Sequence, residues 1–285
     1  MFEYHFFLLT TRSYTHVGQG AAESAVIDSL IQREQPYNIP VIYASSLKGA
    51  IRDHYEFILD KKDEADFLFG SQEPEELELN GKTTKTMYQA IVNFFDARLL
   101  FLPVGALAKY NYYYATSPYV LNRFAEMYKQ ITGIDYQLQL ELPSKIETFI
   151  SYAKDKNELT PWIEGIQGNN IHKDKEFLNQ KLFGIKKDKM AIFNDELFFA
   201  LCRDCIPVLE HNKLDDYGIS ENKFNEEVLP YDTKMWFFIS FPDTLKNDPT
   251  ITTLITKLPD KYIQIGANAS LGQGLCEIEE IKNDY

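Results

Sequence analysis

The segment SSLKG at residues 45–49 combines residue types that suit contact with a phosphate group. Ser45 and Ser46 are expected to provide the N-cap of a helix, because apolar residues with helical spacing follow them. The amide groups at the start of that helix and the ammonium of Lys48 would form an anion site, which Arg52 would extend one turn later. A capped surface helix with two solvated cations has the same pattern, so the residues alone leave both interpretations open.

A second segment, GANASLGQG at residues 266–274, is rich in glycine and follows an expected strand. Gly266, Gly272 and Gly274 would let the backbone approach a ligand closely and direct amide groups at phosphates, with Asn268 inside the segment. No Lys-Ser/Thr pair follows, as a Walker loop requires, and no dinucleotide-binding context surrounds it. A tight connection between two strands is the alternative.

Asp28 is the candidate catalytic residue, and it lies in the segment AVIDSLIQRE at residues 25–34. A carboxylate in such a polar loop could bind Mg²⁺ or accept a proton from a ribose 2′-hydroxyl. His16 precedes a glycine turn and could lie near Asp28 as an acid–base partner, or it could bind the loop backbone. Many loop aspartates instead stabilise turns or cap helices.

Cys202 and Cys205 form a lone CxxC pair, and His211 follows six residues later. A zinc site needs a fourth ligand, which His172 or Cys276 would have to supply from elsewhere in the chain. Because a lone CxxC is a weak signal, these cysteines are best interpreted as incidental residues of a hairpin.

The pattern of apolar residues predicts the elements that carry these segments. Strands are expected at residues 2–9, 39–43, 90–95, 99–104, 111–115, 235–241 and 262–265, and helices at 45–58, from Ser117, and at 248–258. This order predicts an α+β fold with a ferredoxin-like, split βαβ arrangement over residues 1–130 and 230–285. We expect residues 131–201 to be a mostly helical insertion and residues 202–229 a projecting hairpin.

Composition is that of an ordinary globular protein, with 285 residues, 45% hydrophobic residues and 25% charged residues. A net charge of −13 argues against coating of nucleic acid by the whole surface, although a local groove can still bind phosphates. Three unevenly spaced cysteines fit a reducing compartment. No apolar run has the length of a bilayer span, so we expect a cytoplasmic protein without membrane contact.

The order of the motifs is more specific than any single motif. It closely resembles the RAMP superfamily and, within it, the backbone subunit of type III-B (Cmr) CRISPR effectors. The matching segments are THVGQG (15–20), VIDSLIQRE (26–34), IPVIYASSLKGAIRD (39–53), LFGS (68–71), FFDARLLFLPV (94–104), TSPYVLNRF (116–124), NEEVLPYDT (225–233) and YIQIGANASLGQG (262–274).

The resemblance implies an RRM-related palm and a hairpin thumb, several copies of which polymerise along a CRISPR guide RNA beside other type III-B subunits of an antiviral system. It implies metal-dependent cleavage of complementary target RNA at Asp28, with Mg²⁺ or Mn²⁺. Lys48 falls on a guide-backbone contact, with Arg52 assisting, and the glycine-rich segment falls on the family's terminal loop. The EE-x-LP segment places Glu226 and Glu227 after the thumb, and Glu227 is a further candidate for the catalytic site.

Two departures from the family pattern affect these expectations. The usual Asp-Leu-Pro is replaced by Asp28-Ser29-Leu30, and Gly105-Ala106 stands where an arginine commonly follows FPV. Two alternatives therefore stay open: an RNA-binding structural subunit without nuclease activity of its own, and a stand-alone nuclease that processes CRISPR precursor RNA with His16 as acid or base.

Overall fold

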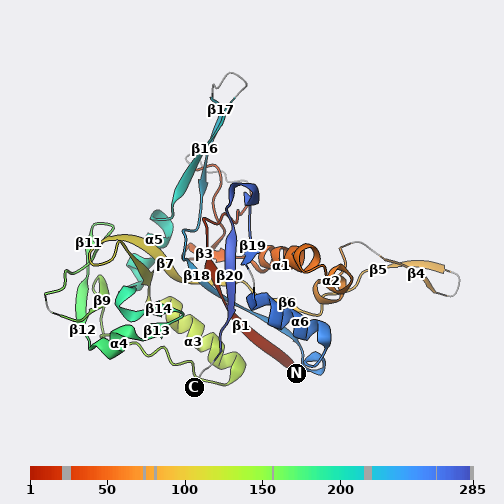
Figure 1. The fold of residues 1–285 in the computed structure, drawn as a ribbon, viewed down its shortest axis with the longest axis horizontal. Helices are drawn as coiled ribbons and strands as arrows, with labels where there is room; N and C mark the ends of the chain where they lie inside the picture. Colours follow the sequence, from red (N-terminus) through yellow and green to blue (C-terminus); the bar gives the residue numbers. More distant parts are fainter. Residues whose placement is uncertain are drawn as a thin grey trace.

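Two segments from opposite ends of the chain form the centre of the main sheet (Figure 1). Strand β1 (Phe2–Thr11) pairs antiparallel with β18 (Lys234–Pro242) on one side and with β20 (Leu275–Glu280) on the other. Strand β18 also pairs antiparallel with β7 (Ala97–Leu107), which gives the order β20-β1-β18-β7. This computed structural model describes residues 1–20, 27–72, 75–79, 82–155, 157–214, 220–260 and 262–282.

Both faces of this sheet are buried, which explains the nearly continuous apolar sequence of β18. Helix α1 (Ala44–Asp53), which continues into a π-helical turn (His54–Ile58), and helix α6 (Pro249–Lys257) pack on the face that carries Phe7. Helix α3 (Pro118–Thr132) packs on the opposite face, which carries Trp236. The sheet therefore separates two hydrophobic cores.

The helix starts were predicted with mixed success. Asp248 caps α6 as expected, because its carboxylate accepts hydrogen bonds from Thr250 N at 2.9 Å and Ile251 N at 3.2 Å. The predicted serine N-cap of α1 is wrong, since the helix begins at Ala44 and Tyr43 is the N-cap residue. The Ala44 amide is instead bound by the carboxylate of Asp96 at 2.8 Å, a partner 52 residues away.

The predicted strand at residues 262–265 is not the last strand of the sheet. It corresponds to the short strand β19 (Tyr262–Gln264), which pairs only with β20, whereas β20 follows the glycine-rich segment and pairs with β1. Strand β20 was not predicted from the sequence. Alternation of buried Cys276 and Ile278 with glutamates is the signal that could have found it.

The prediction of a mostly helical segment at residues 131–201 is wrong. The described residues of this range contain seven strands, which extend the sheet beyond β8 (Tyr112–Thr116) or form short hairpins: β9 (Phe149–Ala153), β10 (Trp162–Ile163), β11 (Ile166–Gln167), β12 (Asn169–His172), β13 (Lys181–Leu182), β14 (Ile185–Lys186) and β15 (Met190–Phe193). The helical residues described there belong to the end of α3, α4 (Lys175–Asn179), a 3₁₀ turn (Lys187–Lys189) and the start of α5 (Asp195–Asp204). Most of these strands are too short for their periodicity to reveal them.

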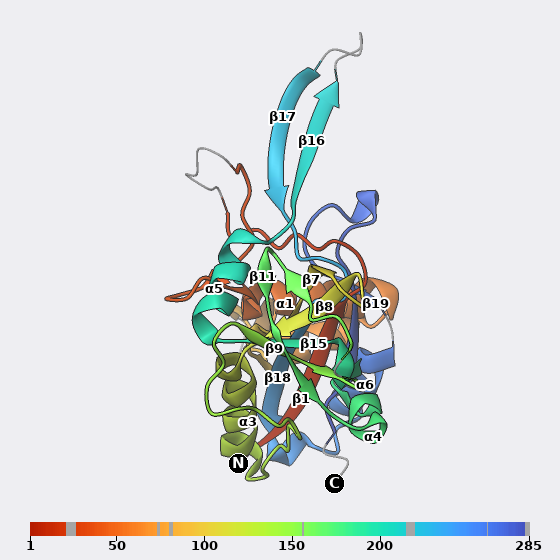
Figure 2. The same cartoon turned by 90° about the vertical axis from the view of Figure 1, so that its left-hand side faces the viewer.

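Strands β16 (Val208–Leu214) and β17 (Ser220–Glu227) form an antiparallel hairpin that projects from the body (Figure 2). This confirms a hairpin within residues 202–229, but Cys202 lies in α5 and Cys205 directly follows that helix. A second projecting hairpin, β4 (Glu75–Leu79) and β5 (Lys82–Thr86), was not predicted (Figure 1).

The remaining elements are β2 (Arg33–Glu34), β3 (Ile39–Ile42), β6 (Asn93–Phe94) and α2 (Lys62–Phe69). Strand β3 pairs with β7 and leads directly into α1, and this connection fixes the start of α1 at one end of the sheet. None of the helices in the described residues combines the length and the apolar composition that a bilayer crossing requires.

Candidate nucleic-acid interface

Three segments that are far apart in the sequence line one open cavity of about 590 Å³. Helix α1 forms one wall, the start of the glycine-rich segment forms another, and the turn at Gly18 contributes between them. The lining residues include Ser45, Ser46, Gly49, His16, Gly266 and Ala267. The structure thus brings the serine motif, the glycine-rich segment and His16 together, and we name this cavity the groove.

The start of the glycine-rich segment is held against the segment that carries His16. Ala267 N donates to His16 O at 2.9 Å, and Gly274 N donates to Tyr14 O at 2.8 Å. Gly266 has φ +86°, and a Cβ there would lie 2.1 Å from His16 O. Gly266 is therefore required by the close approach of two backbones, while the space around Gly272 is open.

A buried carboxylate lies at the root of the hairpin, between two histidines. Glu226 Oε1 lies 3.5 Å from His16 Nε2, and Glu226 Oε2 lies 3.3 Å from His211 Nε2. Asn268 Nδ2 donates to the same Oε2 at 2.7 Å. Glu226 therefore connects the hairpin, the glycine-rich segment and the turn before Gly18.

His16 is 3% exposed, and both of its ring nitrogens have hydrogen-bond partners. Its Nδ1 donates to Glu227 O at 2.6 Å, so Nε2 accepts from the Ser29 hydroxyl at 3.0 Å in the neutral ring. The side chain thus contacts the neighbour of Asp28. The departure from the family pattern at Ser29 supplies this hydroxyl.

Glu227 faces away from that cluster, because successive side chains of a strand point to opposite sides. Its carboxylate pairs with the Arg33 guanidinium at 3.0 Å and accepts from Ile31 N at 3.2 Å. Glu227 was the catalytic candidate predicted from the sequence, whereas the contacts of Glu226 were not predicted. The EE pair in a strand was the signal that one of the two glutamates must face the opposite side.

Asp28 is exposed and lies beside the root of the hairpin. Its amide donates to Asn225 O at 3.1 Å, and its Oδ2 accepts from Asn225 N at 2.8 Å. Ser29 O accepts from Glu227 N at 2.9 Å, which continues the pairing along β17. These bonds fix the aspartate backbone while leaving the carboxylate accessible to a ligand.

The two basic residues of α1 differ in their surroundings. Arg52 is buried, and its guanidinium binds Glu56, Asp66 and the Gly70 carbonyl, so it joins α1 to α2. Lys48 has no hydrogen-bond or ion-pair partner within the described part of the chain, and burial together with the nearby Arg52 charge lowers its pKa. Lys48 is thus the cation of this helix that remains available to a phosphate.

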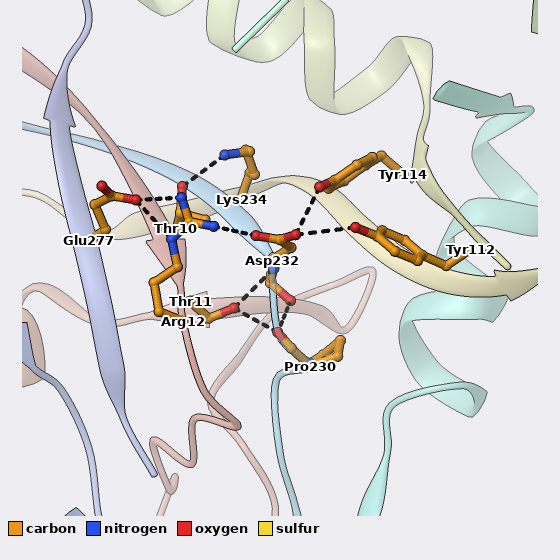
Figure 3. Close-up of polar contacts among 10 residues, drawn as sticks. Thr10, Thr11, Arg12, Tyr112, Tyr114, Pro230, Asp232, Lys234 and Glu277 are labelled. Atoms are coloured by element: carbon orange, nitrogen blue, oxygen red, sulfur yellow. Dashed lines mark hydrogen bonds and ion pairs between the residues drawn. The ribbon is translucent and has the colours of Figure 1, made fainter. Parts of the chain in front are cut away.

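The segment after the hairpin is anchored by a polar network between strands (Figure 3). Asp232 binds the Arg12 guanidinium and accepts from the hydroxyls of Tyr112 at 3.2 Å and Tyr114 at 3.0 Å. Arg12 also binds Glu277 on β20, and the Thr11 hydroxyl donates to Pro230 O at 2.6 Å. This network joins β1, β8 and β20 to the segment that follows the hairpin.

The donor atoms of the described residues do not form a protein cage for a metal ion. No group of three or more His, Cys, Asp or Glu side chains converges in them. Mg²⁺ is often held by only one or two carboxylates, with phosphates and water completing its shell. Asp28 fits that limited role, whereas Glu226 and Glu227 are already engaged by protein groups. Cys202 and Cys205 are free thiols.

The large mixed sheet with helices on both of its faces defines an α+β protein. Residues 8–277 match the family model of the RAMP superfamily, and the chain belongs to this superfamily. A curated relative, the CRISPR system Cmr endoribonuclease Cmr4 of Pyrococcus furiosus, is 30% identical over 297 residues. The alignment covers 97% of this chain and 96% of the relative.

Solved structures support the same fold. The oligomeric Cmr4 from Pyrococcus furiosus is 24% identical, with a TM-score of 0.69 over 98% of this chain and 99% of that one. A chain of the type III-B Cmr-beta complex bound to cognate target RNA is 17% identical, with a TM-score of 0.73 over 98% of this chain and 97% of that one. At these identities the likeness concerns the fold.

Proposed function

We propose that this chain is the backbone subunit of a type III-B CRISPR RNA-guided effector, and that it cleaves complementary target RNA at Asp28. The observation that carries the proposal is the position of Asp28, an exposed carboxylate fixed at the root of a projecting hairpin beside a groove lined by three separate motifs. The name of the curated relative, an endoribonuclease, supports the same activity. We infer that the subunit works in the cytoplasm with other type III-B subunits.

The strand order supports a ferredoxin-like, RRM-related palm. In β20-β1-β18-β7 every neighbouring pair is antiparallel. Helix α1 lies between β1 and β7 in the chain, and α6 lies between β18 and β20. This is the connectivity of the split βαβ fold. The projecting β16–β17 hairpin then takes the role of the thumb.

The groove suits a backbone contact that does not depend on RNA sequence. Small side chains on α1 and the glycine-rich segment leave room for a strand of guide RNA. Lys48 belongs to the same helix but is not among the residues that line the groove, so its phosphate contact would lie outside the groove. Phosphate contacts position a strand, while base pairing between guide and target supplies the specificity. Further copies of the chain would repeat this groove along one guide.

The hairpin would separate base pairs of the guide–target duplex beside Asp28, which frees the target backbone from A-form geometry. Asp28 then accepts the proton of a ribose 2′-hydroxyl, and the oxygen attacks the adjacent phosphorus while the bond to the 5′ oxygen breaks. The leaving oxygen takes up a proton, so the products carry a 2′,3′-cyclic phosphate and a 5′-hydroxyl. A divalent cation, Mg²⁺ or Mn²⁺, held by Asp28 would neutralise charge on the phosphate.

Asp28→Ala and Asp28→Asn in the reconstituted complex test this assignment. We expect target cleavage to fall by about 10²-fold or more, the usual effect of removing a general base, with guide RNA affinity unchanged. Asp135→Asn, a change of an exposed aspartate after α3, is the matched control and should cleave normally. Full cleavage by Asp28→Ala with normal RNA binding would contradict the assignment.

The same experiment addresses the two alternatives. A wild-type complex that binds guide and target without regular cleavage would identify a structural RNA-binding subunit. A stand-alone nuclease would cleave without partner subunits and in the presence of EDTA. The engaged nitrogens of His16 argue against that activity.

A further inference from the structure

One face of α1 and of the π-helical turn after it lines the groove along its whole length. Ser46, Gly49, Asp53 and Phe57 line the cavity at intervals of three or four residues, which places them on one side of a helix, and Ala50 lines it beside Gly49. At about 1.5 Å per residue, Ser46 and Phe57 lie roughly 16 Å apart along the axis. That length exceeds the rise of about 3.4 Å between stacked nucleotides, so the groove can hold more than one nucleotide.

Phe57 is an apolar side chain that the fold leaves in solvent. It is 75% exposed, whereas Ile51 and Tyr55 on the same helical segment are each 1% exposed and belong to the core. Phe57 lies in the π-helical turn His54–Ile58, and such turns occur frequently at functional sites. Its ring therefore contributes little to the core and is available to a ligand in the groove.

The remaining wall of the groove suits a planar group beside this ring. Gly49 has nothing within 4 Å of the position that a Cβ would occupy, and Ala50 adds only a methyl group, so there is space in front of α1. Asp53 is exposed at the same end of the helix and would repel a phosphate. A base or a ribose can instead donate a hydrogen bond to that carboxylate. Phosphates are then favoured near Ser45 and Ser46.

We propose that Phe57 is a stacking platform for one nucleobase of the RNA strand held in the groove. This inference rests on the proposed function and deepens it, since it assigns a base contact to a groove that otherwise binds only the backbone. Every base has an aromatic face, so stacking on Phe57 would hold the strand without selecting its sequence. Asp53 would lie beside the stacked nucleotide as an acceptor for an amino group or the 2′-hydroxyl.

Binding of guide RNA to the full chain, measured by fluorescence anisotropy at two salt concentrations, tests this contact. We expect Phe57→Ala to weaken binding by about tenfold, in the range observed for loss of one base–aromatic stack. Phe57→Leu should remain weak, because it keeps the apolar surface but lacks the ring, and Phe57→Trp should bind at least as well as wild type. The salt dependence should stay unchanged in all three variants, because no phosphate contact is lost.

Phe2→Ala is the matched control, since Phe2 is 48% exposed at the start of β1 and lies outside the groove. It should bind guide RNA like the wild type. Tryptophan emission gives a direct readout, because the new indole of Phe57→Trp should be quenched by RNA beyond any change that Trp162 and Trp236 show in the wild type. Thermal melting checks that each variant is folded, which we expect because the ring is exposed.

The outcomes separate the two proposals. If the wild-type chain does not bind guide RNA, the proposed function fails and the stacking contact fails with it. If the wild type binds and Phe57→Ala and Phe57→Leu bind equally well, the stacking contact is overturned while the function stands. If Phe57→Ala instead abolishes association between copies of the chain in the absence of RNA, the ring packs against protein and the stacking contact is again overturned.

Discussion

At the scale of single residues, the glycine-rich segment contains glycines that serve different purposes. Gly266 and Gly274 lie where the backbone passes close to other atoms: an added Cβ would be 2.1 Å from His16 O at the first and 2.3 Å from Gln264 Nε2 at the second. Gly272 has φ +76° but has open space around it. The left-handed backbone at Gly272 explains the glycine at that position. Gly266 and Gly274 are explained by atoms that would clash with a Cβ.

Alanine substitutions of Gly266 and Gly272 should therefore have different effects on stability. Gly272→Ala should lower the free energy of unfolding by about 1–2 kcal/mol, the cost of a left-handed conformation for a residue with a Cβ. Gly266→Ala should lower it by more than about 3 kcal/mol, because it adds a clash with a backbone atom to that cost. Urea denaturation measures both, and Gly272→Ala serves as the control for Gly266→Ala.

Equal losses in the two variants would show that the contact between Gly266 and His16 O is unimportant. Target cleavage provides a second measurement. Because Gly266 lies against the His16 backbone, Gly266→Ala should displace His16 and reduce target cleavage. Gly272→Ala should leave cleavage close to that of the wild type.

At the scale of elements, the network around Asp232 connects strands that are far apart in the sequence (Figure 3). Its carboxylate binds Arg12, which directly follows β1, and accepts from the hydroxyls of Tyr112 and Tyr114 on β8, while Arg12 also binds Glu277 on β20. Asp232 has φ +66°, a conformation that Asp and Asn tolerate better than most residues. Both the side chain and the backbone thus favour Asp at this position.

Asp232→Ala should lower the free energy of unfolding by about 3 kcal/mol or more, because it leaves partly buried hydroxyls and a cation without their shared acceptor. Asp232→Asn keeps an acceptor oxygen and tolerates the left-handed backbone, so it should lose less than half as much. Urea denaturation at constant salt provides the measurement. Identical losses in the two variants would assign the effect to the charge alone.

At the scale of the whole molecule, the sheet separates two cores, and thiols are buried within one of them. Cys202 on α5 and Cys276 on β20 both belong to the core on the α1 face. Burial raises the pKa of the Cys276 thiol to about 12 and also raises that of Cys202 well above its ordinary value of 9.0. Both thiols are therefore neutral and shielded in the folded protein at neutral pH.

These raised pKa values predict how stability depends on pH. The folded state keeps thiol protons that the unfolded chain loses above about pH 9, so this contribution to stability is complete below pH 9 and is lost as the pH rises towards 12. Cys276→Ala should reduce that alkaline loss. Iodoacetamide at pH 8 should leave Cys202 and Cys276 unmodified until urea is added, as mass spectrometry can determine. Rapid native alkylation of either residue would contradict the described burial.

Several features of the fold followed from the sequence because their causes are local. The apolar runs predicted β1 and β18, Asp248 and Pro249 predicted the start of α6, and the turn-forming residues after Cys205 predicted a projecting hairpin. The short strands of residues 131–201 could not be predicted in this way. Strand β15 pairs with β8 and β9, β12 pairs with β9, and β10 pairs with β7, and no local pattern specifies these partners.

The order of motifs in the sequence by itself indicated the superfamily, and the residue types indicated the glycine-rich segment as a candidate phosphate contact and Asp28 with His16 as a candidate catalytic site. Only the tertiary structure decided which neighbouring groups complete that site. Glu226 meets His16 and Asn268 while Glu227 meets Arg33, and Arg52 is used to join two helices. The physical reason is the range of the interactions: caps and periodicity act within a few residues, whereas these ion pairs depend on the register between segments that lie up to about two hundred residues apart.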